Sequence, residues 1–348
     1  MKKKVALFLV VVFMASLLAG CGGGGSSPSQ EPAEQKEATA QPIVLRLGHN
    51  VTEATALHRG ALEFAKLVEQ KSNGTIKVDV FPNATLGDNR QMLEGMQLGS
   101  VDMCLPNLSN IAGFTDKTAV FELPYLFKNE AAAEAVFDGP IGDELFADLE
   151  KSGLVGLAYW TQGWRHITTS NREVRKPEDM KGLKFRTMEN ERHMQHFNAL
   201  GASAIPMAFS ELYSSLQQGI IDGQENPYVN IYLNGLYECQ KYITETGHIY
   251  DAIPLLISKI TWDKLTPEQQ QILREAAKEV TSLEREMSRE DDRKYKQAII
   301  DSGKCQIIEL TPEERQAFRD AAQVVYDMNR DKIGADYIQR ILDAQEGF

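Results

Sequence analysis

An alternation of strand-like and helix-like segments near the start of the chain constrains the fold more than any other feature. Residues 43–49 and 75–81 alternate apolar and polar side chains with period two, and residues 101–105 form a third short apolar run. Between these runs, residues 54–72 and 88–98 carry apolar side chains at helical spacing. A β-α-β-α-β order of this kind predicts a parallel sheet with helices on its faces.

A second unit of the same kind follows the first. Its strand-like runs are 154–160, 165–169, 183–187, 202–205 and 220–223, and its helical patterns are 191–200 and 208–218. Ligands of α/β proteins bind beyond the carboxyl ends of strands, often between domains. The sequence therefore predicts an α/β fold with two lobes and a ligand cleft between them.

The chain of 348 residues suits two lobes better than one compact core. We assign residues 43–162 and 252–290 to lobe I and residues 163–251 and 291–330 to lobe II, joined by crossover strands. Residues 331–348 are assigned to a C-terminal helix.

A long helix is predicted in the last third of the chain. Thr266-Pro267-Glu268-Gln269 fits a capping box with proline at the first helical position, and the helical pattern continues to Ser302 before Gly303. At 1.5 Å per residue this helix is roughly 50 Å long, which exceeds the width of a small lobe. No sustained heptad supports a coiled coil, so we expect the helix to cross both lobes.

The N-terminus has the pattern of an export signal. Three lysines precede an apolar run that is too short and too abruptly ended for a membrane span. The run ends in Leu-Ala-Gly-Cys21, which resembles a bacterial lipobox, whose cysteine is diacylated; an ordinary signal peptide with an incidental cysteine is the alternative. We predict a signal peptide over 1–20, lipidation of Cys21 and a flexible Gly/Ser/Pro/Glu-rich tether over 21–42.

Charge and cysteine content exclude several classes of protein. The net charge of −12 leaves no basic stripe for nucleic acid. Cys104, Cys239 and Cys305 fit neither a disulfide framework nor zinc-ligand spacing, and all three are interpreted as small core residues. A bond between Cys104 and Cys239 in an oxidising compartment stays open.

Catalytic signatures are not found in the sequence. There is no GxSxG, HExxH, CxxC or Walker-type loop. His193 and His196 stand at i, i+3 with Glu189 nearby, but no further metal ligands are evident, so two polar residues on a helix are the simpler interpretation. We predict a protein that is not an enzyme and has no cofactor or metal.

Two arginines could serve a ligand. Arg165 and Arg186 lie in short strand-like runs, and neighbouring parallel strands would bring them together. A guanidinium can hold a carboxylate through two hydrogen bonds, although each arginine could equally form a surface or structural ion pair. Downstream, Phe209 and Tyr213 fall in a helical pattern and Asn226 precedes a proline in a loop after a strand, so their spacing alone assigns them no role.

Longer motifs carry a family resemblance. Residues 165–227 contain TSNR, PEDMKGLKFR, LGASAIPMAFSELY, LQQG and IDGQENP, and the first unit contains FPNATLGDNRQMLEGMQLGSVDM and FELPYLF. These segments closely resemble the solute-binding subunits of TRAP transporters, the DctP family, and the resemblance covers residues 43–345. It implies a periplasmic-binding-protein-like fold whose two domains, crossed by a long helix, close on an organic acid.

The resemblance also implies roles for individual residues. Arg186 matches the arginine that holds the ligand carboxylate, and Arg165 matches a second arginine. Asn226 matches the asparagine of QENP, Phe209 an aromatic wall of the cleft, and Asn50 the asparagine after the first strand.

Departures from the family pattern bear on the ligand. Sialic-acid-binding members carry charged groups in two loops where this chain has Asn89 and Asn107, which makes sialic acid a poor fit. Neutral amides suit hydroxyl groups, so a sugar acid, uronate or hydroxy acid is favoured over a C4-dicarboxylate or keto acid. Glu189 could accept a hydroxyl hydrogen bond or be a helix-entry charge. Further candidates for the cleft are Tyr213, Trp164 and His49.

Together these features predict a monomeric, extracytoplasmic receptor, periplasmic or on the cell surface, that reaches the membrane only through its lipid anchor. It would deliver an organic acid to the membrane permease of a TRAP transporter. A binding protein for another transporter class, a chemosensory receptor and an exported hydrolase using His193 and His196 are the rivals.

Overall fold

The computed structural model describes residues 41–348. The predicted signal peptide, the lipidation of Cys21 and nearly all of the tether lie outside the described residues. Within them, the chain forms one compact unit from Gln41 to Phe348.

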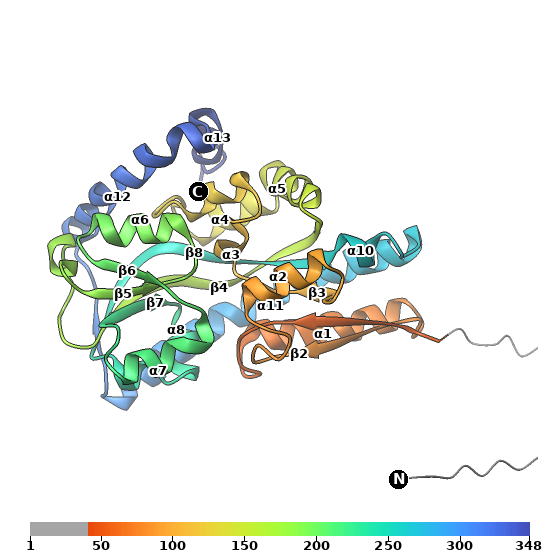
Figure 1. Ribbon diagram of the computed structural model, residues 1–348, viewed down its shortest axis with the longest axis horizontal. Helices are drawn as coiled ribbons and strands as arrows, with labels where there is room; N and C mark the ends of the chain where they lie inside the picture. The colour runs from red at the N-terminus through yellow and green to blue at the C-terminus, as the bar shows by residue number, and fades with distance from the viewer. Residues whose placement is uncertain (1–40) are drawn as a thin grey trace, which may run out of the picture. The chain divides into compact units, whose positions relative to one another are not determined.

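One mixed sheet runs through this unit (Figure 1). Its strands are β1 (Ile43–Gly48), β2 (Ile76–Phe81), β3 (Met103–Cys104), β4 (Leu154–Thr169), β5 (Lys184–Thr187), β6 (Ser203–Pro206), β7 (Gly223–Asn226), β8 (Tyr242–Ser258) and β9 (Gln306–Ile308). Their order is β2-β1-β3-β8-β4-β7-β5-β6, with β9 paired to β8. The first three strands are parallel, as the β-α-β-α-β pattern predicts. The long antiparallel strands β4 and β8 join the two halves of the sheet.

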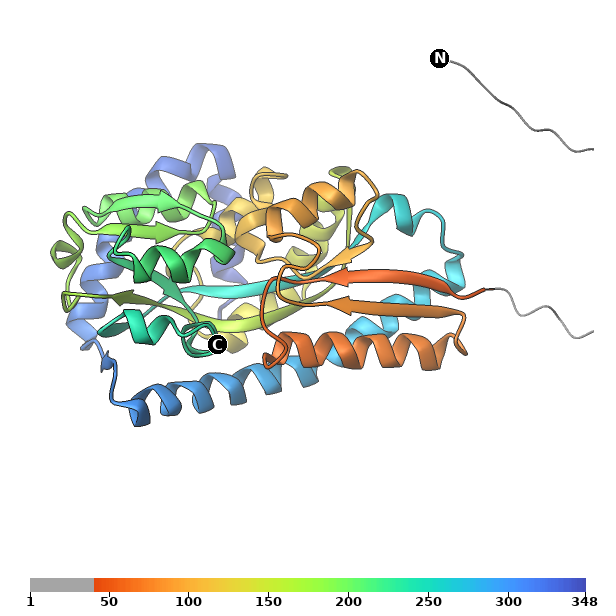
Figure 2. The same cartoon turned by 60° about the horizontal axis from the view of Figure 1, so that its bottom comes forward.

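Helices cover both faces of the sheet (Figure 2). The α-helices are α1 (Ala56–Lys71), α2 (Asn89–Gln97), α3 (Leu108–Ile111), α4 (Glu130–Phe137), α5 (Pro140–Lys151), α6 (Glu191–Ala199), α7 (Leu212–Gln217), α8 (Tyr228–Leu233), α9 (Leu236–Cys239), α10 (Lys259–Trp262), α11 (Pro267–Ser302), α12 (Pro312–Ile333) and α13 (Ala335–Asp343). Three short 3-10 helices are η1 (Asp116–Glu122), η2 (Pro177–Met180) and η3 (Phe209–Glu211).

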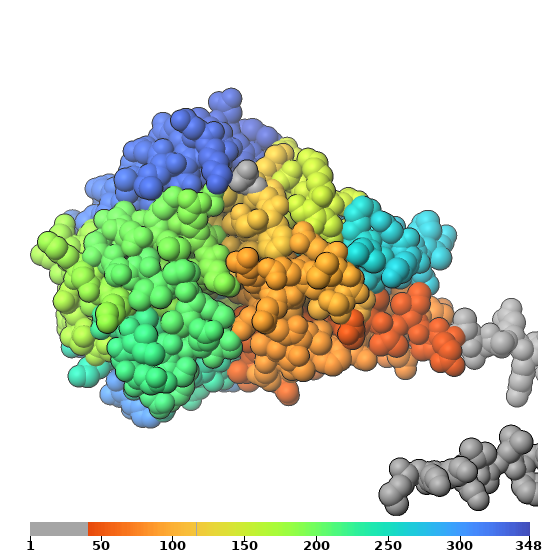
Figure 3. Space-filling model, viewed as in Figure 1, coloured from red at the N-terminus to blue at the C-terminus, as the bar shows by residue number. Residues whose placement is uncertain are grey.

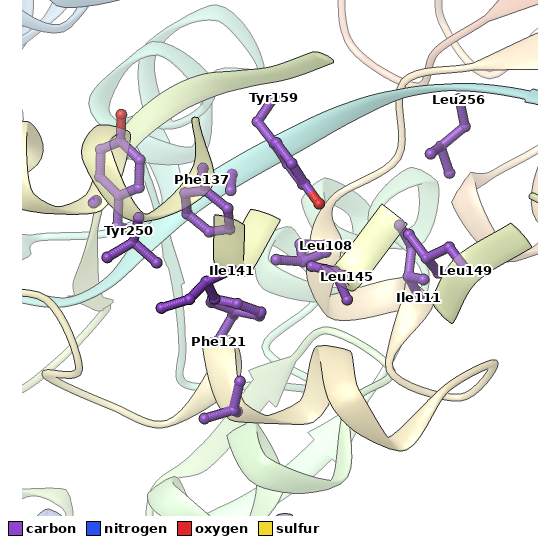
Figure 4. Close-up of a cluster of buried hydrophobic side chains, with 14 of the residues drawn as sticks. Leu108, Ile111, Phe121, Phe137, Ile141, Leu145, Leu149, Tyr159, Tyr250 and Leu256 are labelled. Carbon is purple, nitrogen blue, oxygen red and sulfur yellow. The ribbon is translucent and has the colours of Figure 1, made fainter. Parts of the chain in front are cut away.

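Separate hydrophobic cores support the two halves of the sheet. In the first half, α1 and α11 pack on one face, and α2 to α5 bury an aromatic cluster on the other, where Phe146 stacks on Tyr159 with ring centroids 4.0 Å apart. Figure 4 shows part of this second cluster around Phe137 and Tyr159. In the second half, one core contains Phe185 from β5, Phe197 from α6 and Phe318 from α12.

The long helix α11 is confirmed, with the predicted capping box at Thr266 and with Gly303 in the left-handed region after its last turn. Its N-terminal part adds Leu273 and Val280 to a core of the first half. Its C-terminal part adds Tyr295 and Ile299 to a core of the second half. A single helix therefore ties both halves together.

Several sequence predictions need correction. The runs 154–160 and 165–169 are one continuous strand, β4, whose bulges and Gly163 (φ 85°) interrupt the alternation. The predicted helix 208–218 begins as the 3-10 turn η3 before α7. Residues 331–348 are not one helix, because α12 continues to Ile333 and α13 follows Gly334. The assigned lobe boundaries, which stay a prediction, fall inside β4, β8, α11 and α12.

Candidate functional site

A polar cavity lies between the two halves of the unit. It is lined by residues from both halves: Asn50, Val51, Asp88, Asn89, Asn107 and Asn110 from the first, and Arg165, Arg186, Met188, Glu189, Met207, Ala208, Phe209, Asn226 and Asn230 from the second. In Figure 3 the green segment that includes α7 lies against the orange segment that includes α2. Ser210 Oγ donates to Asp88 Oδ2 across this junction, at 2.5 Å.

Arg186 brings into the cavity a positive charge that forms no direct ion pair with a carboxylate of residues 41–348. Its side chain, on β5, is 2% exposed, and its Nε and Nη2 both donate to the backbone carbonyl of Met207, at 3.0 and 2.7 Å. Nη1 is buried and has no hydrogen-bond partner in the part of the chain that the structure describes. Removal of water from the guanidinium lowers the pKa of Arg186 to about 10, so the group stays charged at neutral pH. This arrangement leaves a cationic donor for an anion.

Arg165, by contrast, is fully engaged with two buried carboxylates. Its Nε and Nη2 donate to Glu225 Oε2 and Oε1, at 2.5 and 2.9 Å, and its Nη1 donates to Asp251 Oδ2 at 2.6 Å. Burial alone would raise the pKa of Glu225, but the charge of Arg165 and the hydrogen bond from His248 hold it well below its ordinary value. Burial keeps the pKa of Asp251 raised. The charge of Arg165 is therefore neutralised within the protein.

The strand order explains how both arginines reach one cavity. We expected neighbouring parallel strands, but β7 lies between β4 and β5 and is antiparallel to β4 and parallel to β5. Asn226, expected in a loop, is the last residue of this intervening strand and pairs with His166 of β4. The sheet thus presents Arg165, Asn226 and Arg186 from three adjacent strands.

Amide side chains form the rest of the polar wall. Asn89 Nδ2 donates to Asn107 Oδ1 at 2.8 Å and to Asn110 Oδ1 at 3.0 Å. On the other side, Asn230 Nδ2 donates to Asn226 Oδ1 at 3.2 Å. Buried amides that bond one another in this way hold fixed orientations, as a specific binding site requires.

A family model described as "Bacterial extracellular solute-binding protein, family 7" (DctP) matches residues 47–332, which include every residue that lines the cavity. The chain belongs to the DctP family. A relative in this family is the 2,3-diketo-L-gulonate-binding periplasmic protein YiaO of Escherichia coli K12. It is 36% identical over 259 residues, which cover 74% of this chain and 79% of that protein.

Solved structures of TRAP solute-binding proteins have the same fold. The sugar acid binding protein DctPAm of Advenella mimigardefordensis, in complex with galactonate, superposes with a TM-score of 0.85 at 33% identity and covers 88% of this chain and 98% of that one. A periplasmic solute-binding protein of Shewanella oneidensis with bound succinate gives a TM-score of 0.84 at 34% identity, covering 88% and 100%. The predicted DctP fold is confirmed.

The structure brings together most of the residues that the DctP resemblance predicts. Those that line the cavity are Arg186, Arg165, Asn226, Phe209, Asn50, Glu189, Asn89 and Asn107. Tyr213 does not line it and faces an adjacent surface hollow at 36% exposure. Trp164 packs against Tyr250 and the first-half core, and the buried His49 contacts His58. Neither Trp164 nor His49 lines the cavity.

Sequence reasoning missed Asp88 and Asn230 as cavity residues. Asp88 is the N-cap of α2, so helix capping already explains an aspartate at this position of the sequence. Asn230 lies within α8, four residues after Asn226. Because Asn226 ends β7 and the helix begins only after Pro227, helical spacing does not connect the two residues, and no sequence signal points to Asn230.

The remaining candidate groups have other surroundings. His193 Nε2 lies 2.6 Å from Glu122 Oε2, and His196 is buried in an aromatic environment. Among residues 41–348, no three His, Cys, Asp or Glu side chains are arranged to hold a metal ion. The three cysteines of this range are free, so the Cys104–Cys239 bond is absent from the structure. None of the helices in the described range is long and apolar enough to span a membrane.

Proposed function

We propose that this DctP-family chain is the receptor of a TRAP transporter and captures an organic acid in the cavity, with Arg186 as the carboxylate anchor. The observation that carries the proposal is the buried Nη1 of Arg186, a charged donor with no hydrogen-bond partner among residues 41–348. A carboxylate offers two acceptor oxygens that match a guanidinium. Its arrival would neutralise the buried charge.

The relatives support a hydroxylated acid. Structures of similar proteins contain galactonate, D-erythronate and D-glucuronate, although others contain succinate. The polar wall around Asn50, Asn89, Asn107 and Asn226 can form hydrogen bonds with hydroxyl groups. Glu189 would add an acceptor at the edge. We therefore favour a sugar acid or hydroxy acid.

The receptor is proposed to act outside the cytoplasm as a monomer and to hand the acid to a membrane permease. Lipidation of Cys21 would hold it at the membrane. No reaction is proposed for the bound acid, because binding alone accounts for the polar groups of the cavity.

Calorimetric titration of the wild-type protein and of Arg186→Gln with galactonate, glucuronate, D-erythronate and succinate tests the assignment. At least one acid should bind to the wild type, and Arg186→Gln should weaken it about 100-fold or more, because one partner of a buried charge pair is lost. Arg330→Gln, which removes an exposed arginine on α12, is the control for net charge. Unchanged affinity in Arg186→Gln would refute the role of Arg186.

A further inference from the structure

Buried polar atoms without a partner indicate what a ligand must supply. Among the residues that line the cavity, one buried donor is unpaired, Arg186 Nη1. Three buried acceptors are unpaired: Asp88 Oδ1, Asn89 Oδ1 and Asn230 Oδ1. Unpaired buried polar groups are costly, so a ligand that complements them gains affinity and one that does not is rejected.

The orientation of Asn89 is fixed by a chain of hydrogen bonds. Asn107 Nδ2 donates to the carboxylate of Asp251 at 2.8 Å, and this carboxylate also receives Arg165. Asp251 accepts from both Arg165 and Asn107, so Asn107 uses its amide nitrogen there and its oxygen faces Asn89. Asn89 therefore donates its amide nitrogen to Asn107 and Asn110, and its oxygen is left as an acceptor at the cavity wall.

A second chain fixes Asn230 in the same sense. It starts at the backbone carbonyl of Cys239, which can only accept, so Gln240 donates its Nε2 to that oxygen and uses its Oε1 to accept from Thr168 Oγ1. The Thr168 hydroxyl, having donated its proton, accepts from Gln224 Nε2, and Gln224 Oε1 then accepts from Asn226 Nδ2. The oxygen of Asn226 is left to accept from Asn230 Nδ2. Asn230 Nδ2 also donates to Gln162 Oε1 at 2.8 Å. Its own oxygen is left unpaired.

Asp88 supplies the third acceptor and carries a negative charge. Its Oδ2 receives Ser210 Oγ, and its Oδ1 has no partner. No second cation balances it in the cavity, because Arg165 is already paired with Glu225 and Asp251. Asn50 and Asn110 also line the cavity, but both side chains are partly exposed and can be hydrated by water.

We infer that Asp88, Asn89 and Asn230 form an acceptor wall that selects an acid with one carboxylate and several hydroxyl groups, and that rejects a second carboxylate. This inference rests on the proposed function, since it takes the carboxylate to be held by Arg186. Hydroxyl groups donate to the three oxygens. A second carboxylate brings only acceptors and a negative charge toward Asp88.

Matched pairs of acids test the selection by calorimetry on the wild-type protein. D-Erythronate is compared with succinate, and D-gluconate with D-glucarate, which carries a second carboxylate at the far end. Each hydroxylated monocarboxylate that binds should do so at least tenfold more tightly than its dicarboxylate partner, and butyrate should bind more weakly than D-erythronate. A dicarboxylate that binds as tightly as its partner overturns the inference. Tighter binding of 4-aminobutyrate than of D-erythronate overturns the hydroxyl assignment in favour of an ammonium group.

Asp88→Asn tests the wall directly. Asparagine keeps the shape and remains a good N-cap for α2, so the fold should be retained. Because the negative charge is lost, the affinity ratio of D-erythronate to succinate should fall at least tenfold. Asp79→Asn, on the exposed side of β2, removes the same charge away from the cavity and should leave the ratio unchanged.

The two proposals fail in different ways. If none of these acids binds, or if Arg186→Gln leaves their affinities unchanged, the receptor proposal fails. If they bind through Arg186 but Asp88→Asn leaves the ratio unchanged, the receptor proposal stands and the acceptor wall is refuted.

Discussion

Two buried arginines of the cavity are in opposite electrostatic states. Arg165 has two carboxylate partners and Arg186 has none. A buried charge with good partners contributes to a stable fold, whereas one without them costs free energy until a ligand supplies the partner. Stability and binding should therefore respond differently to the loss of each arginine.

Loss of Arg165 should destabilise the fold. Arg165→Gln leaves Glu225 and Asp251 buried without their main counterion, and breaking a buried pair in this way typically costs about 3–5 kcal/mol. We expect the free energy of unfolding at pH 7, measured with urea, to fall by roughly that amount. A fall of less than about 1 kcal/mol would show that the network contributes little.

Loss of Arg186 should have the opposite effect on the protein without ligand. Its pKa of about 10, lowered from 12.5 by burial, corresponds to a cost of roughly 3 kcal/mol at neutral pH. The cost is present below pH 10 and is relieved above it, because the folded state disfavours the charged form. Arg186→Gln should therefore raise the free energy of unfolding at pH 7 by about 1–3 kcal/mol. This range allows for the loss of the two hydrogen bonds from Arg186 to the Met207 carbonyl, which offsets part of the gain.

At the scale of elements, α11 packs unusually closely where it crosses the sheet. A Cβ atom on Gly60 of α1 would lie 2.9 Å from Glu284 Cγ of α11, so only glycine allows this approach. Glu284 is fully buried and accepts from the backbone N–H of Thr161 on β4 at 3.1 Å, while its Oε1 is unpaired. Burial raises the pKa of Glu284 to about 8.

This carboxyl should make stability pH-dependent. In the folded protein the pKa of Glu284 is raised above its usual value of 4.5. The stability that the protonated Glu284 contributes is therefore fully present below pH 4.5 and is lost as the pH rises toward 8. The loss is roughly 5 kcal/mol at most. Glu284→Gln, compared with wild type by urea unfolding at pH 5 and pH 8, should flatten this dependence and be relatively more stable at pH 8. Parallel curves for the two proteins would contradict the assignment.

Local signals allowed many of the elements to be predicted, but neither the long strand β8 nor the spatial order of the strands. Helical spacing specifies α1, and the capping box at Thr266 specifies the start of α11, since each depends on residues close in sequence. The placement of β7 between β4 and β5 depends on long-range pairing, which no local pattern encodes. For the site, motifs identified Arg186, but only the structure reveals that Arg165 is neutralised by Glu225 and Asp251.

At the scale of the whole molecule, the halves on either side of the cavity are joined by polar contacts outside it. Asn190 Nδ2 donates to the backbone carbonyl of Ser109 at 2.8 Å, and both residues are buried. Asn190 also caps α6 by accepting from the N–H groups of Arg192 and His193. Neither Asn190 nor Ser109 lines the cavity. We interpret this contact as one that favours the closed arrangement of the two halves.

Asn190→Asp separates closure from direct ligand contact. Aspartate is an equally good N-cap, but it cannot donate to Ser109 and repels that carbonyl. If the ligand binds only the closed arrangement, the apparent affinity falls in proportion as the closed arrangement becomes less populated. We expect acid affinity to drop about tenfold, with X-ray scattering showing that more ligand is needed to reach the compact form. Asn190→Ala, which loses all three side-chain hydrogen bonds, should also destabilise α6 by about 1 kcal/mol. If Asn190→Asp binds acid as wild type does, this contact does not control closure, and the strands β4 and β8 together with α11 must set it alone.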